Sequence, residues 1–90
     1  KMPVSMDGNA KPPYPSMARH ARIPGRVVLQ AIIDEAGNVS ELQVLQASVP
    51  DVGFSEACLS AISTWKYEPG TLDGRPVAVR LVIDIDFILN

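Results

Sequence analysis

The chain has 90 residues, and its eight lysines and arginines against ten aspartates and glutamates give a formal charge of −2. This length fits one small domain, and so weak a charge excludes the basic field on which proteins that bind a phosphate backbone depend. Hydrophobic residues make up 47% of the chain, which excludes a disordered tail, and the apolar runs are too short and too often interrupted by charge to span a bilayer.

Prolines are concentrated at the start of the chain, where four of the eight fall within the first fifteen residues. Residues 1–13 show no helical or strand period, so we predict a Pro-rich linker there, followed by one folded domain over residues 14–90. The chain begins Lys1-Met2 without a signal peptide, and we therefore expect it to be a piece of a longer protein.

The first predicted elements are a short helix and a strand. The helix covers Tyr14–Arg22 with Ser16 as its cap, and Pro24-Gly25 ends it. Residues 27–34 then alternate between apolar and partly polar positions, which predicts a strand with one buried face. The residues on that face are Val27, Leu29, Ala31 and Ile33.

A turn and a second strand follow. The turn spans Asp34–Asn38, and Gly37 can take a positive φ there without a steric clash. We predict the second strand over Val39–Gln46. Its apolar residues do not fall on one face, and a β-bulge would align them. They are Leu42 and Val44 on one face, and Val39 and Leu45 on the other.

The second half of the chain contains a helix and a long strand. Apolar residues at steps of three and four predict a helix that Asp51 caps and that runs to about Trp65. A turn at residues 72–74 follows. Strict alternation then predicts a strand over residues 77–89 with one face on the core. The seven alternating residues are Val77, Val79, Leu81, Ile83, Ile85, Phe87 and Leu89.

This order of elements, helix-strand-strand-helix-strand, predicts an α+β fold. The first two strands form a hairpin, and the second helix returns the chain so that the third strand lies beside the first. We expect a three-stranded antiparallel sheet in the order 2-1-3, with both helices packed on one face. The third strand is then an edge strand.

Residue types that perform catalysis are scarce. His20 is interpreted as part of a solvated helix face, and Cys58 as a small buried thiol, rather than as a catalytic pair. No CxxC or HxxxH spacing indicates a metal site. Asp84 and Asp86 could act as paired carboxylates, although charges on an outer strand face usually keep an edge soluble. We expect no enzyme, no cofactor, no metal site and no nucleic-acid partner.

The edge of the third strand has two interpretations. Its unpaired backbone N–H and C=O groups could accept a peptide from another protein as an added strand. Alternatively, the charged residues Arg80, Asp84 and Asp86 only protect the edge from aggregation. The residue pattern alone leaves both interpretations open.

Four short patterns follow one another along the chain: Tyr14-Pro15-x-x-Ala18, Ile23-x-Gly25-x-Val27, Asp34-x-x-Gly37-x-Val39 and Trp65-Lys66-Tyr67-x-Pro69-Gly70. As an ordered set they resemble the C-terminal domain of TonB-type energy transducers over residues 14–90, and the Pro-rich start resembles the spacer before that domain. Pro15 suits a first helical turn, and Gly25 permits a sharp turn before the strand. Trp65 and Tyr67 can close the end of a small core, and Pro69 is expected to end the helix region before it.

The resemblance implies a periplasmic domain of a protein anchored in the inner membrane of a Gram-negative bacterium. In such proteins the N-terminal helix associates with the ExbB–ExbD motor. The C-terminal domain binds the TonB box of an outer-membrane receptor, by strand addition to the third strand, and so powers the import of siderophores or vitamins. The implied contact residues are Arg19, His20, Val79, Arg80, Leu81, Val82, Ile83 and Asp84.

An alternative is a TonB-like or TolA-like module that mediates interaction or dimerisation in another envelope protein. The same exposed edge could then pair with its own copy in a homodimer.

Overall fold

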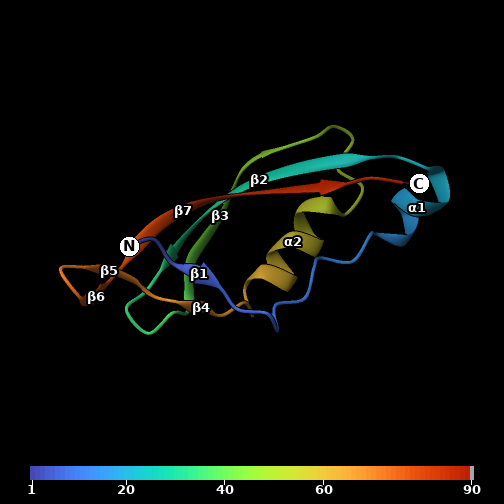
Figure 1. Ribbon diagram of the computed structural model, residues 1–90. Coiled ribbons are helices and arrows are strands. Elements are labelled where there is room, and N and C mark those ends of the chain that lie inside the picture. The colour runs from blue at the N-terminus through green and yellow to red at the C-terminus, as the bar shows by residue number, and fades with distance from the viewer. Residues whose placement is uncertain (90) are drawn as a thin grey trace.

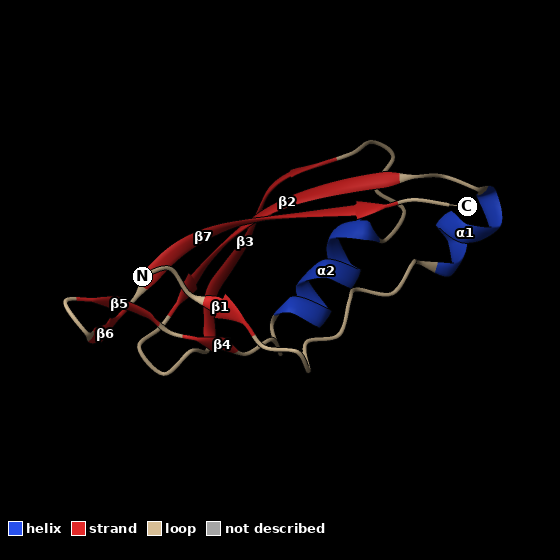
Figure 2. Ribbon diagram, viewed as in Figure 1, coloured by secondary structure: helices blue, strands red, loops and turns tan. Residues whose placement is uncertain are grey.

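The computed structural model describes residues 1–89, which form an elongated molecule of 49 × 24 × 18 Å. Asn90, the last residue of the predicted domain, lies outside the described residues. Long strands form one layer, with the longer helix against one side of it and the shorter helix at its end (Figure 1; Figure 2). The elements are β1 (Val4–Ser5), α1 (Ser16–Ala21), β2 (Gly25–Ile33), β3 (Val39–Ala47), α2 (Phe54–Ile62), β4 (Tyr67–Glu68), β5 (Gly70–Leu72), β6 (Arg75–Val77) and β7 (Val79–Phe87).

The central sheet has three antiparallel strands in the order β3-β2-β7. β7 pairs with β2 over its whole length, from Val79 opposite Ile33 to Phe87 opposite Gly25. The final strand is therefore an edge strand, as expected. Alternate residues of β2 point into the core, as the sequence pattern predicted. Those that are fully buried are Val27, Leu29, Ala31 and Ile33.

The bulge expected in β3 is present, and the pairing with β2 shifts at two places. Leu45 has no partner in the register and is 48% exposed. Further along, Glu41 and Leu42 lie opposite the single residue Ala31, and Glu41 adopts a positive φ of 46°. Because of these shifts, Val39 packs on the core together with Leu42, and the prediction of opposite faces for the two is wrong.

Helix α2 is shorter than predicted at both ends. Gly53 takes the cap position, so the prediction of Asp51 as the cap is wrong. The Asp51 carboxylate nevertheless contacts the first turn, where it accepts the backbone N–H of Ser55 at 3.1 Å and the Ser55 hydroxyl. These hydrogen bonds hold the pKa of Asp51 below its usual value. At the other end, the hydroxyls of Ser63 and Thr64 donate to carbonyls of the last turn, and the helix ends before Trp65.

Helix α1 is also shorter than predicted, and Ser16 makes no capping hydrogen bond. Pro15 takes the cap position, where its carbonyl accepts the N–H of Arg19 at 2.9 Å. Only Ala18 of this helix is buried. Figure 1 shows α1 beside the C-terminal end of β7, beyond the end of α2. Thus α2 covers the face of the sheet and α1 closes its end, whereas we expected both to pack on the face.

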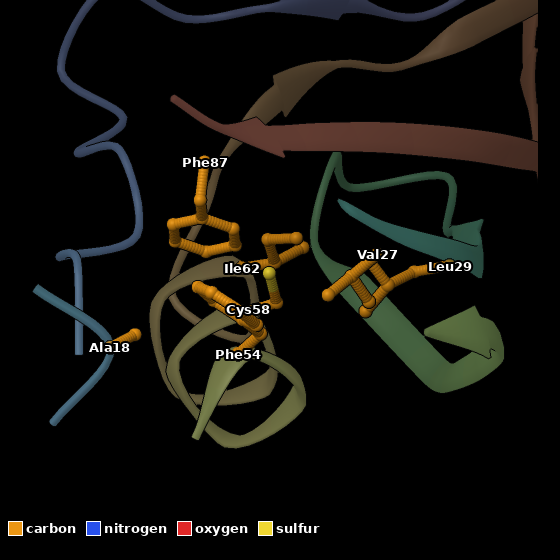
Figure 3. Packing of buried hydrophobic residues seen from close by; sticks show 7 residues of the cluster. All are labelled: Ala18, Val27, Leu29, Phe54, Cys58, Ile62 and Phe87. Carbon is orange, nitrogen blue, oxygen red and sulfur yellow. The ribbon is translucent and has the colours of Figure 1, made fainter. Parts of the chain in front are cut away.

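The main core lies between α2 and the sheet (Figure 3). The rings of Phe54 and Phe87 lie 4.7 Å apart, and Tyr14 packs edge-on against both. The Tyr14 hydroxyl donates a hydrogen bond to the carbonyl of Ile23, so its polar end is satisfied inside this cluster. A smaller cluster at the opposite end of the sheet is formed by Ala31, Ile33 and Tyr67, with Trp65 packed against it.

The α+β class with two helices and antiparallel sheets is confirmed, but the predicted strand count is wrong. β5 and β6 form a small hairpin around the predicted turn at residues 72–74, and Ala78 separates β6 from β7 within the single long strand that we expected. The two-residue strands β1 and β4 pair with each other. A strand of two residues is too short to show an alternation of apolar and polar residues, so the sequence did not predict these two strands. Over residues 1–89, neither helix is long and apolar enough to cross a membrane.

Candidate functional site

The two edges of the central sheet differ in regularity. β3 forms one edge, and its two register shifts break the ladder of backbone groups. β7 forms the other edge, and its unbroken register with β2 keeps its backbone regular, as an added strand requires. Among residues 1–89, no strand other than β2 pairs with β7. The outer edge of β7 is therefore the candidate binding site.

Side chains on the two faces of β7 differ in character. The residues on the core side are half-buried and aliphatic: Val79, Leu81, Ile83 and Ile85. Those on the outer face are exposed: Arg80, Val82, Asp84 and Asp86. Val82 is 62% exposed, although it is apolar. A strand added at this edge would have aliphatic neighbours on one face and mainly charged neighbours on the other.

A groove of about 300 Å³ runs beside the C-terminal half of β7. One wall is the edge from Asp84 to Phe87, the other is formed by Lys11 and Pro12, and Trp65 lines the space between them. The indole N–H of Trp65 donates to the carbonyl of Ala10 at 2.7 Å, which ties the N-terminal segment to this side of the groove. The candidate site thus includes residues from the segment predicted as a linker.

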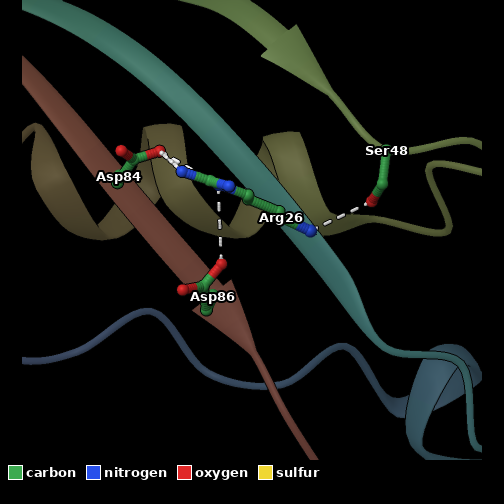
Figure 4. A network of polar contacts seen from close by, with 4 residues as sticks. All are labelled: Arg26, Ser48, Asp84 and Asp86. Carbon is green, nitrogen blue, oxygen red and sulfur yellow. Dashed lines mark hydrogen bonds and ion pairs between the residues drawn. The ribbon is translucent and has the colours of Figure 1, made fainter.

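Arg26 joins the outer faces of β2 and β7 (Figure 4). Its guanidinium lies 3.1 Å from a carboxylate oxygen of Asp84 and 3.7 Å from one of Asp86, and its backbone N–H donates to the Ser48 hydroxyl. All three charged side chains are at least half exposed, so each ion pair contributes at most about 1 kcal/mol. Asp84 and Asp86 are therefore exposed and paired with Arg26. This arrangement supports the interpretation of solvated charges on the outer face rather than that of two carboxylates acting together.

The structure does not bring all predicted contact residues together. Val79, Arg80, Leu81, Val82, Ile83 and Asp84 lie along β7. Arg19 and His20 lie on α1, which Figure 1 shows beside the opposite, C-terminal end of this strand. The Arg19 guanidinium sits 5.9 Å from the centre of the Tyr14 ring, so Tyr14 is its neighbour within the domain.

Sequence reasoning missed Lys11 and Pro12 as groove residues. Their segment has no hydrophobic period, and its position depends on hydrogen bonds to residues far along the chain. Asn9 is the residue that could have indicated that this segment is docked, because an amide side chain can both donate to and accept from a backbone.

The residues of the four family patterns have mainly structural roles. Gly25 does not have a positive φ, so the sharp turn that we expected does not explain why a glycine is needed there. The explanation is packing, because a Cβ at this position would lie 2.3 Å from the ring of Phe54. Gly37 has the expected positive φ, 85°, in its turn. Pro69 does not end a helix, since it lies between β4 and β5. Gly70 and Tyr67 are buried beside it, and Val27 is in the core.

The interpretation of Cys58 as a buried thiol is confirmed. Its side chain is fully buried in the core cluster (Figure 3). Burial raises the pKa of the Cys58 thiol to about 11, and the charge of Asp51 adds to the effect. A thiol held in its neutral form is a poor nucleophile. His20 is exposed on α1, and within residues 1–89 no group of three or more His, Cys, Asp or Glu residues could hold a metal ion.

Comparison with known sequences identifies one family. Residues 10–89 match the family described as Gram-negative bacterial TonB protein C-terminal. The chain is 37% identical to the TonB protein of Vibrio cholerae over 88 residues, which covers 98% of this chain and 36% of that protein. It is also 37% identical to TonB of Pseudomonas aeruginosa over 76 residues, covering 84% of this chain and 21% of the relative.

A solved structure supports the same grouping. The solution NMR structure of the Pseudomonas aeruginosa TonB CTD matches with a TM-score of 0.79 and 29% identity, covering 97% of this chain and 86% of the other. The chain spans about a third of the length of the Vibrio cholerae relative.

Proposed function

Because the chain belongs to the family of TonB C-terminal domains, we propose that it binds the TonB box of an outer-membrane receptor by accepting it as a strand on the outer edge of β7. The observation that supports this most directly is the contrast between the two sheet edges. β7 is regular over its whole length, whereas β3 is interrupted by two register shifts. A segment that pairs through its backbone therefore has one suitable edge.

Because the bound segment would be recognised through its backbone, we expect the affinity of the domain for it to be modest. Each added hydrogen bond contributes about 0.5–1.5 kcal/mol net, and the bound segment must give up its conformational freedom. The remaining affinity and the selectivity come from side chains: the aliphatic row of β7 on one face, and the groove at Trp65 near its end. This mode needs no strong electrostatic field, which agrees with the net charge of −2.

The role in a longer protein follows from the same family membership. We propose that this domain lies in the periplasm, and that segments outside this sequence anchor the protein in the inner membrane and contact the ExbB–ExbD motor. Receptor coupling would then power import of siderophores or vitamins. In this proposal the domain acts by binding, without a catalytic centre or cofactor.

The test is an NMR titration of the ¹⁵N-labelled chain with a synthetic TonB-box peptide. We expect amide shifts along residues 79–87 and at the Trp65 indole, because these groups line the edge and the groove. Shifts confined to β3 or to α1 would contradict the proposal.

N-methylated peptides provide a control for the binding mode. Only alternate residues of a strand point their N–H groups toward a given neighbour. A peptide N-methylated at one alternate set of positions should lose binding, while methylation of the other set should be tolerated. Equal binding by both methylated peptides would exclude strand addition.

Homodimerisation is a second candidate function, and the sequence of β7 favours it. In an antiparallel pair of β7 strands centred on Val82, Arg80 lies opposite Asp84 of the second copy, and Leu81 lies opposite Ile83. Such a pair would also cover the exposed Val82 side chain.

Light scattering over a concentration series tests this dimer. The Val82→Lys substitution should weaken it, since it places two lysines opposite each other at the centre of the pair. Arg75→Lys, outside β7, is the matched control. A monomer mass at all concentrations, or equal dimerisation by the Val82→Lys variant, would contradict this dimer.

A further inference from the structure

The N-terminal segment Lys1–Ala10, here called the strap, is hydrogen-bonded along residues 65–71. Its strand β1 pairs with β4, with Val4 opposite Glu68. The Met6 N–H donates to the carbonyl of Lys66 at 3.1 Å, and the Thr71 N–H donates to the carbonyl of Lys1 at 2.8 Å. The expected linker is thus docked on the domain over its first ten residues.

Asn9 makes the most extensive side-chain contact of the strap. Its amide oxygen accepts the backbone N–H of Lys66 at 2.7 Å, and its amide nitrogen donates to the carbonyl of Lys66 at 2.8 Å. The same nitrogen donates to the Ser5 hydroxyl, within the strap. One residue later, the carbonyl of Ala10 accepts the indole N–H of Trp65. Asn9 and Ala10 therefore anchor the strap at two adjacent points.

Little apolar burial supports this docking. Met2, Val4 and Met6 remain 59%, 46% and 46% exposed. Hydrogen bonds of modest net value must therefore offset the cost of ordering the strap. A segment held in this way opens before the core does, so its docked population responds to small changes in free energy.

The anchors stand directly before one wall of the groove. Lys11 and Pro12 follow Ala10 without an intervening residue, and they face β7 from Asp84 to Phe87. Pro12 and Pro13 restrict the backbone, so the position of this wall depends on where the chain is anchored before it. Trp65 belongs to both sites, because its indole holds Ala10 and its side chain lines the groove.

We propose that docking of the strap and binding of a partner at the edge of β7 strengthen each other, with Asn9 as the positioning residue. This inference rests on the proposed function of β7. When the strap is released, the groove loses the wall formed by Lys11 and Pro12, and only the docked fraction of molecules offers the complete site. Because coupling between two binding events is reciprocal, a bound partner holds the strap in place to the same extent.

The test compares affinities for the synthetic TonB-box peptide in the 90-residue chain. Asn9→Ala removes the anchor to Lys66 and should weaken binding by about three- to tenfold. Trp65→Phe keeps an aromatic ring but removes the N–H donor to Ala10, and should weaken binding in the same direction. Asp7→Ala, elsewhere in the strap, changes a side chain that makes none of these hydrogen bonds and is the matched control, with affinity near that of the wild type.

Amide hydrogen exchange separates positioning from a general loss of structure. In Asn9→Ala the amides of Met6 and Thr71 should exchange faster, while those of β2 stay protected. Saturating peptide should slow exchange at Met6 and Thr71 in the wild-type chain, because the coupling is reciprocal.

The outcomes distinguish this inference from the function on which it rests. A wild-type chain that fails to bind the peptide overturns both. A wild-type chain that binds, with equal affinity in Asn9→Ala and Trp65→Phe and no change in exchange at Met6, overturns the coupling alone.

Discussion

Replacing Gly37 with alanine should destabilise the domain by about 3 kcal/mol or more. Gly37 has a φ of 85°, which an L side chain rarely adopts, and a Cβ at this position would lie 1.9 Å from the carbonyl oxygen of Tyr67. The turn cannot move away freely, because the Tyr67 N–H donates to the Gly37 carbonyl at 2.8 Å. Urea unfolding of the variant and the wild type measures the difference.

Gly74→Ala is the matched control for this substitution. Gly74 also has a positive φ, 79°, but nothing lies within 4 Å of a Cβ built there. It should therefore cost only the backbone penalty, about 1 kcal/mol. Equal losses in the two variants would show that the close approach of Gly37 to Tyr67 contributes nothing to stability.

Phe54→Ala should cost about 3–5 kcal/mol, a large share of the roughly 5–15 kcal/mol that stabilises such a domain. Phe54 is fully buried and is the largest such side chain in the core. Its ring contacts Phe87 and Tyr14 and lies directly against Gly25, so truncation opens a cavity between α2, α1 and the sheet. Chemical denaturation provides the measurement.

Leu59→Ala, in the same helix, tests whether the loss at Phe54 comes from the cavity. Leu59 is 37% exposed, and its truncation should cost about 1 kcal/mol, since solvent already reaches the side chain. A loss at Phe54 as small as that at Leu59 would contradict the packing described for the core.

Elements with a repeated period could be predicted from the sequence. Residues of β2 alternate over the full strand, and the apolar stripe of α2 recurs at helical spacing, so both elements were found with the correct buried face. Their ends were less accurate: the hydroxyls of Ser63 and Thr64 end α2 early, and propensity alone does not reveal this competition for carbonyl groups.

The candidate site was predictable only in part. Alternation in β7 and the order of elements identified the edge, but the groove depends on contacts between residues more than fifty positions apart, such as Asn9 with Lys66. Such contacts leave no local pattern. The same holds for α1: its apolar residues were visible, but its place beside the end of β7 follows from the packing of Ala18 against the core.

The two register shifts in β3 also limit how copies of this domain can assemble. An open sheet with two regular edges can grow without end, because every added copy presents a fresh edge for the next. Here the central sheet has one regular edge, so a pair formed through β7 would use that edge on both molecules and leave the interrupted β3 edges of the two central sheets outside. On this geometry, growth of the central sheet through β7 would stop at two molecules, and the regular edge proposed for binding would not start a fibre.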